Sequence, residues 1–208
     1  MHVGSSVGTV VKILVVGHFG VGKTTYIGNI SEIEPLRTEE VITEASAGFD
    51  DLSGSPDKTT TTVAMDFGRL TLNEQLVLFL FGTPGQERFK ELWEDLSLGA
   101  LGALVLVDPT RLGESFPILD LVERYGLPYA IGVNHFERRS RRTHAGVGAP
   151  VGRPEEPGSG TVTYPLDEVR EALNVPEKTP VVACDVRDQK SAVGALVTLV
   201  THLQSRLD

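Results

Sequence analysis

The stretch that decides the fold is GHFGVGKTTYIGNI, from Gly17 to Ile30, which follows the apolar run VVKILVV. It matches the pattern G-x-x-x-x-G-K-[ST], in which a glycine-rich turn joins a buried strand to a helix. The fixed positions of that pattern are Gly17, Gly22, Lys23 and Thr24. The backbone N–H groups of such a turn, together with the positive end of the helix dipole, attract an anion. The sequence therefore predicts a phosphate-binding loop rather than a glycine-rich turn that only precedes a helix.

The side chains of this loop predict how a nucleotide would be held. Lys23 adds a point charge at the phosphates, and the Thr24 hydroxyl is a candidate Mg²⁺ ligand. Thr25 is the next polar residue and is expected at the α-phosphate. Phe19 is a large residue for such a loop, and we expect it close to the γ-phosphate. The loop is expected to wrap the phosphate oxygens through Phe19, Gly20, Val21 and Gly22.

Around this loop, apolar runs alternate with segments of helical spacing. The apolar runs are continuous, which is typical of strands buried on both faces of a parallel sheet. They lie at residues 10–16, 77–81, 100–107, 129–133 and 180–185. Helical spacing is found at residues 23–33, 88–98, 114–125, 166–173 and 188–207. The sequence therefore predicts an α/β fold with a mixed, mostly parallel sheet and helices on both faces.

One pair of strands is expected to run antiparallel. The segments TTTVAMDFGRL and QLVLFLF are separated by a short polar turn at Asn73 and Glu74. Two extended segments joined by so short a connection form a hairpin. This antiparallel hairpin is expected on an otherwise parallel sheet.

Length and composition limit the class of protein. The chain has 208 residues with 40% hydrophobic content, which predicts a single domain over residues 1–208. Its formal net charge of −9 argues against a nucleic-acid-binding face. A single cysteine and the lack of an export or lipidation pattern favour a cytoplasmic protein without an integral membrane segment, which a partner could still recruit to a membrane. Two long polar stretches, 35–59 and 136–163, interrupt the pattern, and the second predicts a flexible insertion at about 138–163.

Two further segments resemble the switch regions of Ras-like small GTPases. FGTPGQERF, residues 81–89, is similar to their switch II, which implies that the Gly85 amide contacts the γ-phosphate and that Gln86 orients the attacking water. DKTTTTVAMDFGRL, residues 57–70, looks like switch I. There Thr62, or alternatively Thr61, is expected to close over Mg²⁺ and the γ-phosphate, although a threonine run is also ordinary strand sequence. Lys23, Gln86 and Thr62 are therefore the candidate catalytic residues.

Taken together, GHFGVGKTT, TTTTVAMDFG, FGTPGQERF, LVLVD and PVVACDVRD resemble the conservon-type (CvnD) bacterial GTPases, which are relatives of the polarity GTPase MglA. The resemblance implies a Ras-like P-loop NTPase fold, binding of GTP or GDP with Mg²⁺, and slow GTP hydrolysis. It also implies a roadblock-fold protein and a sensor histidine kinase as signalling partners, with activating or exchange factors possible. It covers nearly the whole chain apart from the Arg/Gly/Pro-rich insertion.

The first departure from the Ras-like pattern concerns the metal. Gly82 stands where most Ras-like proteins have the aspartate that holds Mg²⁺ through water. A glycine supplies no carboxylate. Asp66, in the strand expected to run beside residues 77–81, is our hypothesised substitute, and its alternative role is an ordinary strand-end aspartate. The predicted metal residues are Thr24, Thr62 and Asp66.

The second departure concerns the base. The N-K-x-D loop of GTPases is replaced by NHFE, in which Asn134 can hold the loop, His135 can stack, and Glu137 can accept from guanine N1–H and N2–H. The following S-A-K loop is replaced by ACD, where the Ala183 N–H is expected at guanine O6 with Cys184 beside it. A polar loop at a strand end is the alternative interpretation. Cys184 is more typical of a small buried residue than of a nucleophile.

The alternatives that remain open concern function. A scaffold that holds nucleotide with negligible hydrolysis would also fit Phe19 and Gly82, whereas a small-molecule kinase with RRSRR as a lid fits poorly. Phe89 and Trp93 are spaced i and i+4, so they share one face of the helix expected at 88–98. That face is either a partner surface or the core side of the helix.

Overall fold

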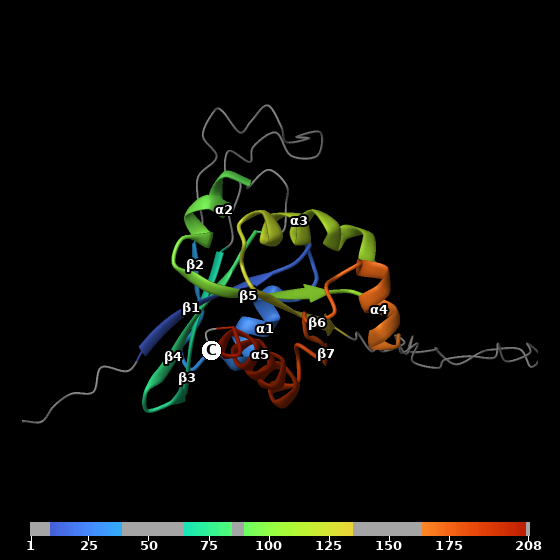
Figure 1. The fold of residues 1–208 in the computed structure, drawn as a ribbon. Helices are drawn as coiled ribbons and strands as arrows, with labels where there is room; N and C mark the ends of the chain where they lie inside the picture. Colours follow the sequence, from blue (N-terminus) through green and yellow to red (C-terminus); the bar gives the residue numbers. More distant parts are fainter. Residues whose placement is uncertain (1–8, 39–64, 85–89, 135–163, 207–208) are drawn as a thin grey trace, which may run out of the picture.

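The computed structural model describes residues 9–38, 65–84, 90–134 and 164–206. Its elements lie in the order expected for alternating strands and helices (Figure 1). The strands are β1 (Thr9–Val16), β2 (Leu36–Thr38), β3 (Met65–Asn73), β4 (Leu76–Gly82), β5 (Ala100–Val107), β6 (Tyr129–Asn134) and β7 (Val181–Cys184). The helices are α1 (Lys23–Ile30), α2 (Lys90–Ser97), α3 (Phe116–Arg124), α4 (Leu166–Leu173) and α5 (Gln189–Gln204), with a short 3₁₀ helix η2 (Leu112–Ser115) before α3.

The strands form one seven-stranded sheet in the order β2-β3-β4-β1-β5-β6-β7. β1 pairs in parallel with β4 and β5, and the parallel pairing continues through β6 to β7. Among the described strands, β3 alone runs opposite to the common direction of the others, because it pairs antiparallel with both β2 and β4. The predicted mixed, mostly parallel sheet is confirmed.

Helices cover both faces of this sheet, which explains why its strands read as continuous apolar runs (Figure 1). Ile13 and Val15 of β1 belong to the core under α1 and α5. Leu14 and Val16 belong to the opposite core, under α2, α3 and α4. Successive side chains of a strand point to opposite faces of the sheet, and helices cover both faces. All four residues are therefore fully buried.

Some boundaries differ from the sequence predictions. β2 lies inside the stretch 35–59 that was expected to be a loop, and Leu36 pairs with Phe67 of β3. The hairpin turns at residues 74–75, one residue later than expected, because Asn73 still pairs with Leu76 and its side chain accepts from the Gln75 N–H at 2.9 Å. The predicted flexible insertion and the rest of the first polar stretch lie outside the described residues.

Three helices are also shorter than expected. α1 ends at Ile30 rather than residue 33, since Ser31 is extended (φ −70°, ψ 134°) and its hydroxyl bonds the Ile33 carbonyl. α5 ends at Gln204, and α3 begins only after η2, with a proline in its first turn. Propensity and spacing alone do not mark these ends, because side-chain hydrogen bonds and caps decide them.

Trp93 resolves one of the open alternatives. Its side chain is 1% exposed and belongs to the core beneath α2, α3 and α4, so it is not part of a partner surface. Phe89 lies outside the described residues. Trp93 instead packs α2, the helix that follows the predicted switch II segment, against the sheet.

We therefore expect Trp93→Ala to lower the free energy of unfolding by about 3–5 kcal/mol, because it leaves a cavity in a packed core. Leu98, just after the same helix, is 78% exposed, and Leu98→Ala is the matched control with an effect within about 0.5 kcal/mol. Denaturant unfolding measures both. Equal, small effects would show that α2 is not packed as described.

Candidate functional site

The predicted phosphate loop lies where the sheet reverses its direction of winding. β1 sits between β4 and β5 in the middle of the sheet. From β1 the chain enters α1 on one face, whereas from β5 it enters η2 and α3 on the other face. In open α/β sheets, ligands bind outside the carboxyl ends of the strands at such a reversal. The topology therefore places the loop at the expected ligand position.

Two glycines give this loop its path. Gly22, which precedes α1, has φ 106°, a conformation that side-chain-bearing residues rarely adopt. Gly17 lies so close to β5 that a Cβ there would stand 2.5 Å from the Leu106 carbonyl oxygen. The pattern requires glycine at both positions for these reasons, so the motif and its geometry agree.

Lys23 closes the loop from inside. Its ammonium donates to the carbonyl oxygens of Gly17 at 2.8 Å and His18 at 2.9 Å. Burial lowers the pKa of Lys23 to about 8, and the nearby negative charge of Asp66 partly opposes that shift. A phosphate at this loop would add negative charge beside the ammonium and favour its protonated form.

The hydroxyl of Thr24 is already paired with a carboxylate. Thr24 Oγ1 donates to Asp66 Oδ2 at 2.5 Å, and Asp66 is only 4% exposed. Hydroxyl and carboxylate oxygens are ligands that suit Mg²⁺, which keeps several waters and takes only one or two protein ligands beside phosphate oxygens. Within the described residues, no group of three or more His, Cys, Asp or Glu could hold a metal ion alone. The oxygens present fit a magnesium ion bound together with phosphate.

Asn134 connects the phosphate loop to the opposite side of the site. Its buried side chain donates to the Val21 carbonyl at 2.9 Å and accepts from the Val186 N–H at 3.3 Å. It thereby joins the phosphate loop to the connection between β7 and α5. Its predicted role at the base stays a prediction, because residues 135–137 of that loop lie outside the described residues.

The residues of the ACD segment divide into two groups. Cys184 is fully buried in the core, and burial raises the pKa of its thiol to about 12, so the side chain is neither a nucleophile nor able to reach a base. Only its backbone remains a candidate contact. Ala183 is exposed at the end of β7, opposite Val133 of β6.

The other predicted site residues stand as follows. Phe19 is 69% exposed, and Gly20 and Thr25 are also exposed. The structure thus brings the loop residues together with Asp66 and Asn134. Thr62, Gly85, Gln86, His135 and Glu137 lie outside the described residues, so their roles stay predictions.

Sequence reasoning missed His18. It is 3% exposed, its Nδ1 lies 2.8 Å from the Phe19 carbonyl oxygen, and the same nitrogen lies 3.5 Å from a Glu114 carboxylate oxygen in η2. His18 therefore links the phosphate loop to the segment after β5. Its position in the motif accepts any residue, so no sequence signal could have identified it.

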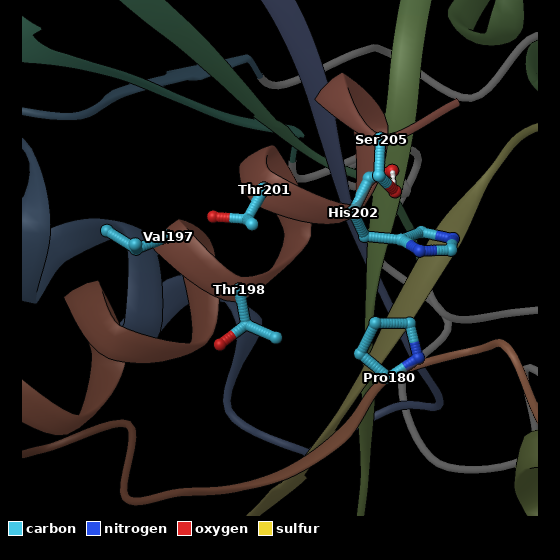
Figure 2. Close-up of a pocket in the computed structure, with 6 residues that line it drawn as sticks. All are labelled: Pro180, Val197, Thr198, Thr201, His202 and Ser205. Atoms are coloured by element: carbon cyan, nitrogen blue, oxygen red, sulfur yellow. Dashed lines mark hydrogen bonds between the residues drawn. The ribbon is translucent and has the colours of Figure 1, made fainter. Parts of the chain in front are cut away.

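A shallow pocket of about 330 Å³ lies elsewhere on the protein, along the second half of α5 (Figure 2). It is lined by Pro180, Val197, Thr198, Thr201, His202 and Ser205. Pro180 precedes β7, so the pocket is at the end of the sheet opposite the carboxyl ends of the strands. None of the predicted site residues that the structure describes lines it.

Comparison with solved structures shows which known fold this is. The G domain of the T. maritima FeoB iron transporter superposes with a TM-score of 0.58 at 14% identity, covering 93% of this chain and 99% of that one. The cytosolic domain of the same transporter in a GDP form gives 0.60 at 14% identity, covering 95% and 64%. The FeoB G domain of Methanococcus jannaschii gives 0.54 at 12% identity, covering 94% and 99%. The predicted fold, that of a Ras-like P-loop NTPase, is confirmed.

Comparison of sequences shows the family. An uncharacterized protein, MJ1339 of Methanocaldococcus jannaschii, is 32% identical over 126 residues, which cover 60% of this chain and 69% of that protein. No helix in the described part of the chain is long and apolar enough to cross a membrane. The family described as "Conserved hypothetical ATP binding protein" matches residues 15–206, which span the phosphate loop and nearly all of the sheet. The chain belongs to this family of nucleotide-binding P-loop proteins, and it has the fold of a G domain.

Proposed function

We propose that this protein is a molecular switch that binds GTP with Mg²⁺ and hydrolyses it slowly. The observation that carries the proposal is the phosphate loop itself, with Lys23 bonded across it and the Thr24 hydroxyl facing the Asp66 carboxylate. A partly buried cation and a buried carboxylate at the ends of strands add nothing to apolar packing. Withdrawing such charges from water is costly, so they indicate a binding site. A nucleoside triphosphate with its metal ion would add a negative charge beside Lys23 and a positive charge beside Asp66.

The described residues have different proposed roles toward the phosphates and the metal ion. The loop backbone and Lys23 hold the β- and γ-phosphates, and Thr24 and Asp66 are the residues that would hold Mg²⁺. Bound there, the ion would neutralise the charge that develops on the phosphate oxygens during transfer. Asn134 fixes the position of the loop relative to the β7–α5 connection through its hydrogen bonds to the backbone of Val21 and Val186.

We assign guanine as the base because of the segment that begins at Asn134. The two hydrogen bonds of that buried amide fix where the next residues start, and Glu137 in this segment can accept from guanine N1–H and N2–H. Adenine offers an unprotonated N1 and no N2 amine. The name of the family mentions ATP, so the base must be tested directly.

Hydrolysis is expected to be slow without a partner. Gln86 would orient the attacking water, and Lys23 and Thr62 complete the proposed catalytic set. Phe19 stands 69% exposed on the phosphate loop, where its ring would obstruct an arginine supplied by another protein. The same feature favours a second candidate function, a docking subunit that holds nucleotide with negligible hydrolysis.

The partners and location that we propose for the switch follow from its resemblance to the conservon-type GTPases. A roadblock-fold protein and a sensor histidine kinase are the proposed partners, with an activating or exchange factor as a further expectation. We propose a cytoplasmic location in which a partner brings the protein to the membrane.

Lys23→Ala should weaken GDP and GTP binding by about 100-fold or more, because it removes the one side-chain cation aimed at the phosphates. Lys12→Ala is the matched control, because Lys12 lies on β1, the strand that leads into the loop, and its ammonium bonds the Leu98 carbonyl away from the site. Titration of a fluorescent GDP analogue measures both. Unchanged affinity in folded Lys23→Ala would refute the phosphate-loop assignment.

Wild-type protein should prefer GTP over ATP, and Glu137→Ala should reduce this preference by about 10-fold or more, since an unsatisfied partner costs about 1–3 kcal/mol. Glu137→Asp should keep or sharpen the preference. Glu177→Ala, which removes an exposed carboxylate between α4 and β7, is the control. Competition of GTP and ATP against fluorescent GDP decides the base, and equal competition would make this a nucleotide switch of another specificity.

Gln86→Leu should slow single-turnover GTP hydrolysis by about 100-fold, because orienting groups of this kind contribute roughly 2.7–4 kcal/mol. Gln75→Leu removes an exposed glutamine of the β3–β4 turn and should leave the rate unchanged. A Gln86→Leu protein as fast as wild type would favour the docking-subunit function.

A further inference from the structure

The carboxylate beside Thr24 comes from an unexpected strand. In P-loop NTPases, the Thr or Ser of the phosphate loop shares its Mg²⁺ with an aspartate at the end of a neighbouring strand. β4 is the parallel neighbour of β1 on that side, and it ends at Gly82, which has no side chain. Asp66 lies instead on β3, which runs antiparallel to β4.

Asp66 and Gly82 are direct partners in the β3–β4 ladder. Residues opposite each other on neighbouring strands project their side chains to the same face. A Cβ built on Gly82 would stand 3.2 Å from Asp66 Cβ and 3.4 Å from Asp66 Oδ2. The two positions therefore share one space, and the Asp66 side chain passes through the space that a side chain at position 82 would use.

The position of Asp66 relative to the phosphate loop is fixed by α1. The residue after the helix cap, Glu32, donates its N–H to the Arg69 carbonyl at 2.8 Å. Its carboxylate accepts from the Thr71 N–H at 2.8 Å and the Thr71 hydroxyl at 2.9 Å. These bonds hold the end of α1 on β3, so the start of α1 brings Thr24 Oγ1 to 2.5 Å from Asp66 Oδ2.

We propose that Asp66 is the carboxylate that orients Mg²⁺ at this site, and that it has exchanged places across the strand pair with the residue at position 82. The ion would bind between the Thr24 hydroxyl and the phosphate oxygens, with Asp66 holding one of its waters. The inference rests on the proposed function, because it requires a nucleotide at the phosphate loop. Its structural alternative is that Asp66 only holds Thr24 and offsets the charge of Lys23.

The test compares GDP affinity with Mg²⁺ and with EDTA, and the ratio of the two affinities is the readout. Asp66→Asn keeps the size of the side chain and can still accept from Thr24, but it removes the charge. We expect it to lower the Mg²⁺-to-EDTA ratio by about 10-fold or more, the usual effect of losing a residue that positions a metal ligand. In EDTA the variant should bind GDP at least as tightly as wild type, since one negative charge near the phosphates is gone.

A merely structural role predicts a different result. If Asp66 only shaped the loop, Asp66→Asn would weaken binding equally with Mg²⁺ and with EDTA, leaving the ratio unchanged. That outcome would overturn the inference. Asp108→Asn is the matched control, because Asp108 is another buried carboxylate at the end of a strand, and its Oδ1 accepts from the Thr110 N–H at 2.8 Å.

The exchange itself is tested by moving the carboxylate back. Asp66→Gly alone should lose the Mg²⁺ dependence, and the double variant Asp66→Gly with Gly82→Asp should restore the ratio to within about threefold of wild type. The double variant removes the Asp66 atoms that crowd position 82, leaving the flexible end of Ile27, at 3.0 Å, as the near neighbour. A folded double variant that lacks Mg²⁺ dependence would overturn the exchange.

Failure of the function and failure of this inference give separate results. Wild-type protein that binds GDP neither with Mg²⁺ nor with EDTA would refute the proposed nucleotide switch. Wild-type protein that shows Mg²⁺-dependent binding, together with an Asp66→Asn variant of undiminished ratio, would refute only the role of Asp66. If the double variant melts below the assay temperature, the ratio of Asp66→Asn decides the metal role by itself.

Discussion

The partly buried ammonium of Lys23 is the constraint on which the rest of the site depends. It is bonded to the carbonyl oxygens of Gly17 and His18, and those carbonyls face it only because the glycine-rich loop lies tightly against the end of β5. Removing a cation from water is costly unless hydrogen bonds and opposite charge compensate. Here the loop carbonyls supply the hydrogen bonds, and Asp66 supplies the opposite charge. A bound phosphate would increase that compensation, so the unliganded loop is already arranged for an anion.

The same loop is tied to the far side of the site through Asn134. Because that amide donates to Val21 and accepts from Val186, a displacement of the phosphate loop disturbs the β7–α5 connection as well. The N-terminus of α5 is in turn capped by Asp188, which accepts from the Ser191 N–H at 2.7 Å. The phosphate loop and the β7–α5 connection are therefore joined through buried hydrogen bonds, which are costly to leave unmade.

The sequence predicted the sheet well because burial on both faces produces continuous apolar runs, and β5 was predicted with its observed bounds. It missed β2, since three residues with an exposed leucine carry no period and pair only because β3 lies beside them. For Trp93, helical spacing identified a face but could not say what covered it, whereas the packed structure does. The hairpin pattern placed Asp66 beside the strand that ends at Gly82, and the structure has it there, whereas its role toward a metal stays a prediction. His18 was not found, since its contact with Glu114 joins segments that only the fold brings together.

The charge of the chain shows where nucleotide affinity must come from. A formal net charge of −9 repels a triphosphate, but exposed charges are screened over about 8 Å at physiological ionic strength. Only groups in direct contact with the phosphates would act at full strength, and among the described residues we expect these to be the loop N–H groups and Lys23, with Asp66 acting in the opposite sense. A carboxylate at that point weakens the attraction of the bare loop for phosphate. A divalent cation that accompanied the nucleotide would reverse this effect, so we expect the arrangement of Lys23, Thr24 and Asp66 to favour the metal-bound nucleotide over the free anion.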